Sequence, residues 1–143
     1  MTWTSYAGKW VEDPTNTTPY LDVLQAQGVS WAMRQVIKLL KVSYTITDNE
    51  STLDSVDIQG TVEHIDLNWE WVARTHPVFG PYKDRVKRNN DGNLVIETVS
   101  EQRGWAITGV WTLEDDGETH TRRYEFKSKS LNKSLNLVYK RQA

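Results

Sequence analysis

The chain has no cysteine, and it lacks several patterns that mark particular classes of protein. Without cysteine there can be no disulfide, no thiol nucleophile and no thiolate metal ligand. The net charge of −2 creates no strong field that would attract nucleic acid or an anionic membrane surface. No apolar run approaches the roughly 20 residues that a membrane-spanning helix needs. We therefore expect neither a nucleic-acid partner nor a membrane span.

Motifs for metals, cofactors and secretion are missing as well. The three histidines are scattered without close ligand spacing, which predicts no metal site. A phosphate-binding loop, a dinucleotide fingerprint and a nucleophile elbow are all absent, so we expect no cofactor. The segment Met1–Ser5 has neither the basic nor the apolar region of a signal peptide, and we expect a cytosolic location. The length of 143 residues predicts one domain, residues 1–143, with a core of its own.

Tryptophan and tyrosine are the residues present in excess. The chain has seven tryptophans and six tyrosines but only two phenylalanines. Tryptophan and tyrosine combine a large contact area with one polar group, which needs a partner when it is buried. Two interpretations stay open, a core built from large side chains and a cavity lined by aromatic rings. A β-barrel would accommodate both.

The N-terminal third predicts one strand followed by two short helices. The strand covers roughly residues 5–11 and carries Trp10. Thr18 and the proline after it predict the start of a first helix, and Ser30 can cap a second one. Met33 begins an apolar series in the second helix at i, i+3, i+4 and i+7 spacing. Two short helices with a shared apolar side predict a helical hairpin that covers another part of the protein.

From residue 41 onward apolar and polar residues alternate, which predicts strands. Tight turns are predicted at Asn90–Asn93 and Asp115–Gly117, and one strand is expected near Leu67–Trp71. About nine strands with short connections favour an antiparallel sheet, and closure of that sheet would remove its exposed edges. The predicted fold class is all-β: a closed antiparallel up-and-down barrel of about nine to ten strands, with a helix-turn-helix lid after the first strand. Such a barrel has room for one small ligand.

Two strands carry candidate chemistry. His120, Arg122, Tyr124 and Phe126 share one face of a strand, and that face points either into the barrel or out to solvent. If it points inward, the guanidinium and the phenol could bind a carboxylate, phenolate or enolate oxygen. Glu63 lies on an earlier strand, where it could transfer a proton in the cavity or lie at a polar rim. Both alternatives stay open for each strand.

Several motifs resemble the lipocalin and cytosolic fatty-acid-binding-protein superfamily. Gly8 and Trp10, the helix pair, and Gly28–Val29 with Arg34 are similar to its signature. The helical lid and the hairpin from Gly104 to Thr119 resemble the fatty-acid-binding branch. That branch usually carries Arg-x-Tyr on its last strand to bind the ligand carboxylate. Here Leu137 occupies the position two before Tyr139, so the resemblance does not carry over that device.

The first two-thirds of the chain looks closer to lipocalin-like proteins of filamentous fungi. This resemblance supports the fold much more than an activity. It rests on four runs: Leu24-Gln25-x-Gln27-Gly28-Val29-x-Trp31-x-x-Arg34, Gly60-Thr61-x-Glu63, Leu67-x-Trp69-x-Trp71 and Phe79-Gly80.

We predict that the barrel cavity binds one small, mostly apolar molecule, aromatic or polyketide-like. The alternative is a cofactor-independent isomerase, cyclase or dehydratase of a fungal-type biosynthetic pathway that uses the same cavity. Proton transfer would then involve His120, Tyr124 or Glu63. Arg34, on the lid, either steers an anionic ligand or is an exposed helix charge. The predicted ligand-binding residues are Trp10, Met33, Arg34, Trp69, Trp71, Trp105, Trp111, Arg122, Phe126 and Tyr139.

Overall fold

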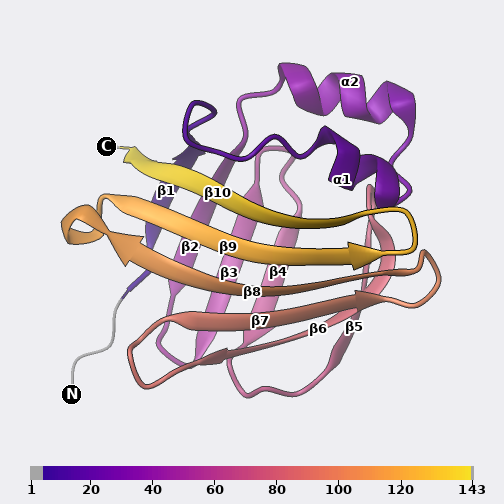
Figure 1. The fold of residues 1–143 in the computed structure, drawn as a ribbon. Coiled ribbons are helices and arrows are strands. Elements are labelled where there is room, and N and C mark those ends of the chain that lie inside the picture. The colour runs from indigo at the N-terminus through magenta and orange to yellow at the C-terminus, as the bar shows by residue number, and fades with distance from the viewer. Residues whose placement is uncertain (1–4, 143) are drawn as a thin grey trace.

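The computed structural model describes residues 5–142, and it consists of one curled antiparallel sheet with two helices at one end (Figure 1). The segment 1–4, which carries most of the expectation about a signal peptide, lies outside the described residues. The strands are β1 (Gly8–Glu12), β2 (Ser43–Asp48), β3 (Thr52–Asp57), β4 (Val62–Asp66), β5 (Val72–His76), β6 (Gly80–Arg88), β7 (Leu94–Ser100), β8 (Trp105–Glu114), β9 (Thr119–Ser128) and β10 (Asn132–Gln142).

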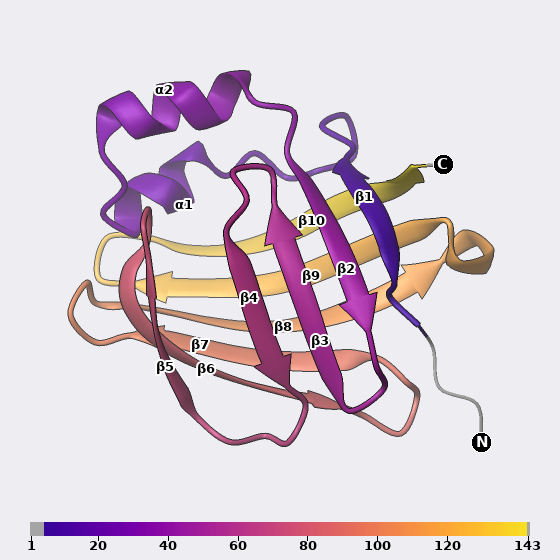
Figure 2. The ribbon, with the colours of Figure 1, turned by 180° about the vertical axis from the view of Figure 1, so that it is seen from behind.

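The two helices lie over one end of the curled sheet, as the lid prediction requires (Figures 1 and 2). They are α1 (Leu21–Ala26) and α2 (Trp31–Leu39). Ser30 caps α2 as expected, because its hydroxyl accepts a hydrogen bond from the Met33 amide at 3.2 Å. The first helix begins later than predicted. Thr18 does not cap it, and the Thr18 hydroxyl instead accepts a hydrogen bond from the Asn136 amide of β10 at 3.0 Å.

The ten strands form one sheet in the order β4-β3-β2-β1-β10-β9-β8-β7-β6-β5. The predicted all-β, antiparallel, helix-capped fold is therefore confirmed. The two ends of the sheet, β4 and β5, lie near each other, but no ladder joins them within residues 5–142 (Figure 2). Near the end away from the helices, Asn68 forms a lone bridge with Lys87, and the Trp69 amide donates to the Val86 carbonyl at 3.0 Å.

Alternation along the strands determines which side chains fill the interior. On β8, Trp105 and every second residue after it face inward, and on β9 the same holds for His120 and every second residue after it. Arg123 therefore faces out to solvent. The inward alternative for the strand that carries Arg122 is thus the correct one. A buried cluster fills the interior away from the lid, and a smaller one around Phe126 lies beneath α1.

The strand predicted at Leu67–Trp71 is wrong. These residues connect β4 to β5, and Trp69 has a positive φ of 63°, which interrupts any extended run. The rings of Trp69 and Trp71 lie on the outer face of β6, where they stack against basic side chains. The Arg85 guanidinium is 4.2 Å from the ring centre of Trp69 and 4.6 Å from that of Trp71. Cation–π contact therefore holds these rings outside the barrel.

Candidate functional site

A cavity of about 310 Å³ lies inside the curled sheet beneath the helices. Its size is at the lower end of the range typical of small-molecule pockets, roughly 300 to 1,000 Å³. Val23 and Leu24 of α1 and Ile37 of α2 form part of its wall, so the helices do cover the space. The remaining wall is mainly apolar and aromatic. Its aromatic residues are Tyr20, Tyr44, Phe79, Tyr82, Trp105, Trp111, Tyr124 and Tyr139.

Arg122 places a buried positive charge in this wall. Its side chain lies among three aromatic rings, with the guanidinium carbon 3.8 Å from the ring centre of Trp111, 4.7 Å from that of Tyr44 and 4.8 Å from that of Tyr139. The residue is only 7 % exposed, and its Nε and Nη2 have no hydrogen-bond partner within residues 5–142. A buried cation with two unused donors is costly unless an acceptor binds there. The site is therefore suited to an anionic or strongly accepting oxygen.

The aromatic groups around Arg122 are held in fixed positions. The Trp111 indole N–H donates to the Tyr124 hydroxyl at 2.9 Å, which joins neighbouring strands β8 and β9. Gly109 lies directly opposite Tyr124 in that ladder, and a side chain at Gly109 would collide with the Tyr124 ring. Burial raises the pKa of Tyr139 well above its ordinary value, so its phenol stays protonated and neutral. Among the described residues, Arg122 is the one positively charged side chain in this part of the cavity wall.

The wall formed by β3, β4 and β6 is instead acidic. Asp57, Glu63 and Asp84 all line the cavity there. The Tyr82 hydroxyl of β6 donates to Glu63 Oε1 of β4 at 2.6 Å, and this contact spans the unpaired sheet edges. The Asp84 carboxylate accepts a hydrogen bond from Arg74 Nε at 2.9 Å. Burial has the largest effect on the pKa of this carboxyl and raises it. The cavity thus has a positively charged side and a negatively charged side.

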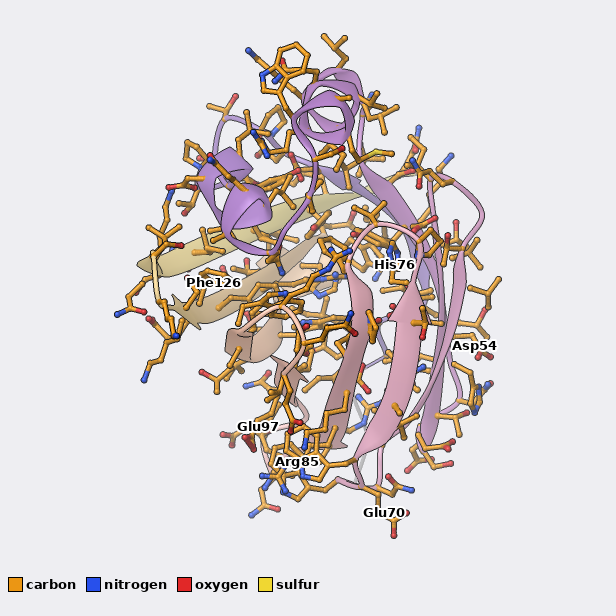
Figure 3. All side chains as sticks on the ribbon, turned by 90° about the vertical axis from the view of Figure 1, so that its right-hand side faces the viewer. Asp54, Glu70, His76, Arg85, Glu97 and Phe126 are labelled. Atoms are coloured by element: carbon orange, nitrogen blue, oxygen red, sulfur yellow. The ribbon has the colours of Figure 1, made fainter. Side chains whose placement is uncertain are left out.

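His76 lies at the lid end of the gap between the sheet edges (Figure 3). Its Nε2 is 3.7 Å from Asp57 Oδ2, and its Nδ1 accepts a hydrogen bond from the Val78 amide at 3.0 Å. The ring also packs against Phe79 with the ring centres 4.9 Å apart. Together with the Tyr82–Glu63 contact, the His76–Asp57 contact joins the two sides of the barrel where the backbone ladder does not.

Arg103 joins the lid to the rim of the barrel. Its Nη1 donates to the Gln27 carbonyl after α1 at 3.2 Å and to the Val78 carbonyl before β6 at 3.0 Å. Gly80 has a φ of 70°, and a side chain there would come within 2.9 Å of the Arg103 guanidinium. The arginine therefore passes over Gly80 and ties three segments that are distant in sequence. Sequence reasoning did not identify this residue, because no local pattern marks it.

Six of the predicted site residues line the cavity and lie around the two charged sides. They are Glu63, Trp105, Trp111, Arg122, Tyr124 and Tyr139. Strand parity groups Trp105 with Trp111 and Arg122 with Tyr124 on shared faces, and the structure shows that these faces point inward. Trp10, Met33, Arg34, Phe126 and His120 do not line it, nor do the two outer tryptophans described above. Arg34 Nη1 donates to the Val29 carbonyl at 2.6 Å, which holds it within the lid.

His120 lies beneath the cavity in a box of aromatic rings. Its ring centre is 5.0 Å from Trp111, 5.2 Å from Tyr6, 5.4 Å from Trp10 and 5.8 Å from Tyr139. The residue has no exposed surface, and neither ring nitrogen has a hydrogen-bond partner among the described residues. Burial, followed by the charges of Arg122 and Arg141, lowers the pKa of His120 well below its usual range. The imidazole is therefore neutral.

Sequence reasoning missed several cavity residues whose signal was present. Tyr82 and Asp84 share parity with the buried Val86, so two-residue alternation could have placed them in the interior. Tyr44 lies on a predicted strand and was not singled out. Asp57 and His76 end their strands, where parity is hardest to assign.

The chain matches no protein-family model and no curated protein. Its fold is shared with solved structures over nearly the whole length. A Schistosoma mansoni fatty acid binding protein in complex with arachidonic acid has a TM-score of 0.75 at 18 % identity over 100 % of both chains. The chain has the fatty-acid-binding-protein fold. The resemblance to that branch stated from the sequence motifs is thus confirmed for the fold.

Two further structures extend the comparison of the fatty-acid-binding-protein fold. Apo Caenorhabditis elegans lipid binding protein 8 has a TM-score of 0.74 at 14 % identity, covering 99 % of this chain and 100 % of that one. The REP1-NXSQ fatty acid transporter has a TM-score of 0.74 at 14 % identity over 96 % of each chain. At these identities the likeness concerns the fold alone. Within residues 5–142 no helix is long and apolar enough to cross a membrane.

Proposed function

We propose that this protein binds one small, largely apolar molecule whose negatively charged oxygen end lies against Arg122. The observation that carries the proposal is a buried guanidinium in the cavity wall whose Nε and Nη2 have no hydrogen-bond partner within residues 5–142. Two proteins of the same fold, a fatty acid binding protein and a fatty acid transporter, support a lipid-like carboxylate. As predicted from the sequence, we also propose that the protein is cytosolic and has no nucleic-acid partner.

The aromatic wall supports a ligand with rings or double bonds. Eight aromatic side chains line the cavity, and they offer both flat apolar contact and polar edges. Burial of apolar surface would provide most of the affinity, at about 25 cal/mol per Å² before the costs of association. The proposed ligand is therefore either an aromatic or polyketide-like molecule, as predicted from the sequence, or a straight-chain fatty acid.

The test compares a charged ligand with a neutral one of the same length. Hexadecanoate and hexadecanol are titrated at pH 7.5 into wild-type protein, Arg122→Met and Arg123→Met. Arg123 is the matched control, because it is adjacent on β9 but faces solvent and pairs with Glu114 at 2.8 Å. A charge-assisted hydrogen bond in a buried site contributes about 1.5 to 3 kcal/mol. We expect Arg122→Met to lose about ten- to a hundredfold in affinity for hexadecanoate, with Arg123→Met unchanged.

Two outcomes would count against the proposal. Equal binding of hexadecanoate by wild-type protein and Arg122→Met would show that the guanidinium does not bind the anion. The same would follow if the acid and the alcohol bound wild-type protein equally well. Arg122→Met should not unfold the protein, since replacing a buried unpaired charge by a similar apolar side chain is neutral or stabilising. Thermal unfolding without ligand checks this.

A second candidate function, catalysis without a cofactor, is favoured by the position of Glu63 and Tyr124. Both line the same cavity as Arg122, so a carboxylate and a phenol are available to a molecule whose oxygen the guanidinium holds. This arrangement suits isomerisation, cyclisation or dehydration through an enolate. The molecule that co-purifies with the protein would be identified by mass spectrometry and incubated with wild-type protein and Glu63→Gln. A product formed only by wild-type protein would establish catalysis, and an unchanged molecule would exclude it for that compound.

A further inference from the structure

Three side chains on the wall away from Arg122 form a group of their own. Glu63 and Tyr82 are joined by the 2.6 Å hydrogen bond across the sheet edges. Tyr82 also packs beside Trp105, with ring centres 6.4 Å apart and planes tilted by 35°. All three residues line the cavity. The Glu63 carboxylate and the Trp105 indole thus both neighbour the same phenol.

Glu63 is the acceptor in this group. Its Oε1 accepts a hydrogen bond from the Tyr82 hydroxyl. Its carboxylate forms no salt bridge within residues 5–142, and the charge of Arg74, which pairs with Asp84, acts on it from farther away. Its acidic neighbour Asp84 differs in this respect, because it pairs directly with Arg74 at 2.9 Å. A carboxylate has about four lone-pair sites, so Glu63 can accept further hydrogen bonds. A ligand group here must therefore be a donor, and it cannot be another anion.

Trp105 is the donor. The residue is only 4 % exposed, and its indole Nε1 has no hydrogen-bond partner among the described residues. An indole N–H can only donate, and a buried tryptophan N–H ordinarily finds a partner. The wall therefore offers one unused donor and one acceptor with remaining capacity. A hydroxyl group can use both, because it donates one hydrogen bond and accepts others.

The strand register separates this group from the positive charge. Tyr44, whose ring faces Arg122, lies opposite Asp57 on β3, and Ser55 on the same strand lies opposite Glu63 on β4. Two strand spacings, about 10 Å, and two residues along β3, about 7 Å, separate Tyr44 from Glu63, so their Cα atoms lie about 12 Å apart. One small molecule can therefore reach from one side to the other. The charge on Glu63 also repels a ligand anion, so it favours the orientation with the anion at Arg122.

We propose that Glu63 and Trp105 form a second subsite that binds a hydroxyl group, and that the ligand is a hydroxylated apolar acid. Its carboxylate lies at Arg122, and its hydroxyl donates to Glu63 and accepts from the Trp105 indole. The inference rests on the proposed function, since it needs the anion at Arg122.

The test uses matched pairs of acids that differ only by a terminal hydroxyl. Decanoate, dodecanoate and hexadecanoate are compared with their ω-hydroxy derivatives by calorimetric titration at pH 7.5. The three lengths bracket the separation of the two subsites. A hydroxyl in water is well solvated, and moving it to an ordinary apolar pocket would weaken binding. We expect wild-type protein to bind at least one hydroxy acid about tenfold more tightly than its parent.

The variants are Glu63→Gln and Trp105→Phe, each with a control on the outer surface. Glu125→Gln is the control for the carboxylate, because Glu125 faces solvent on β9 and accepts from Ser134. Trp69→Phe is the control for the indole, because that ring lies outside the barrel. Each cavity variant should reduce the ratio of the two affinities, hydroxy acid over parent acid, about tenfold; the ratio is the readout because both residues also line the cavity that holds the parent acid. The outer variants should keep the preference. The two variants change different groups, so a folding defect in one does not affect the other.

The binding data distinguish failure of the hydroxyl subsite from failure of the proposed function. If the parent acids bind and depend on Arg122, but no hydroxy acid binds more tightly than its parent, the hydroxyl subsite is wrong and the proposed function stands. A preference that survives in both cavity variants also overturns the subsite. If no acid of either kind depends on Arg122, both proposals fall together.

Discussion

Replacing His120 by leucine should make the folded state less sensitive to acid. His120 is packed among Tyr6, Trp10 and Trp111 without a hydrogen bond to either ring nitrogen in the described part of the chain. Leucine has a similar volume and cannot take up a proton. The His120→Leu change removes no hydrogen bond within residues 5–142, so at pH 7.5 the free energy of unfolding should change by less than about 1.5 kcal/mol.

The expected effect follows from the lowered pKa of His120. In the unfolded chain this histidine takes up a proton near its ordinary pKa of about 6.5, whereas the folded chain keeps it neutral. Stability from the neutral form is complete above that pKa and is lost as the pH falls below it. One such group costs about 1.4 kcal/mol for each pH unit below 6.5, until the folded pKa is reached. Lowering the pH from 7.5 to 5.5 should therefore cost wild-type protein about 1.4 kcal/mol more than the variant.

Urea unfolding at pH 7.5, 6.5 and 5.5 measures this difference. His64→Gln is the control, because His64 is exposed and contacts Asp54 at 2.6 Å and Asp66 at 3.0 Å. Those contacts raise the pKa of His64, so its contribution is present at low pH and is lost as the pH rises through that pKa. The control should therefore lose at least as much stability in acid as wild-type protein. If wild-type protein and His120→Leu lose stability in parallel, the reasoning about the buried imidazole is refuted.

Three further changes test other parts of the structure. Arg103→Met should loosen the lid, seen as faster hydrogen exchange in α1 and faster ligand release; unchanged exchange would contradict its role. Gly109→Ala should destabilise the protein by about 1 to 3 kcal/mol, because the new methyl group collides with the Tyr124 ring, and unaltered thermal unfolding would show that the ring moves freely. Asp48→Ala removes a buried carboxylate 3.0 Å from Arg88, with an expected loss of about 3 kcal/mol or more in urea unfolding; a loss below about 1 kcal/mol would rule out that contribution.

Strand parity and turn chemistry carried most of the successful predictions. The face shared by Arg122 and Tyr124 follows from two-residue alternation, and it needed only the direction of the core. The turns near Gly92 and Gly117 have the positive φ expected there. The region around Trp69 was misjudged because alternation of tryptophans with polar residues looks like a strand wherever it occurs. The basic residues on β6 that hold those rings outside are distant in sequence.

The amino-acid sequence alone determined the antiparallel strand pattern, the helical lid and the face that Arg122 shares with Tyr124, because alternation and capping are local properties of the chain. The tertiary structure decided that this face points inward. It decided as well which inward residues reach the cavity and which, like His120, are enclosed in the core. It also decided which charges find partners: Arg123 pairs with Glu114 outside, whereas two donors of Arg122 have no partner inside among the described residues. Whether a charged group has a partner depends on side chains that the fold brings together across strands, and no local sequence pattern indicates it.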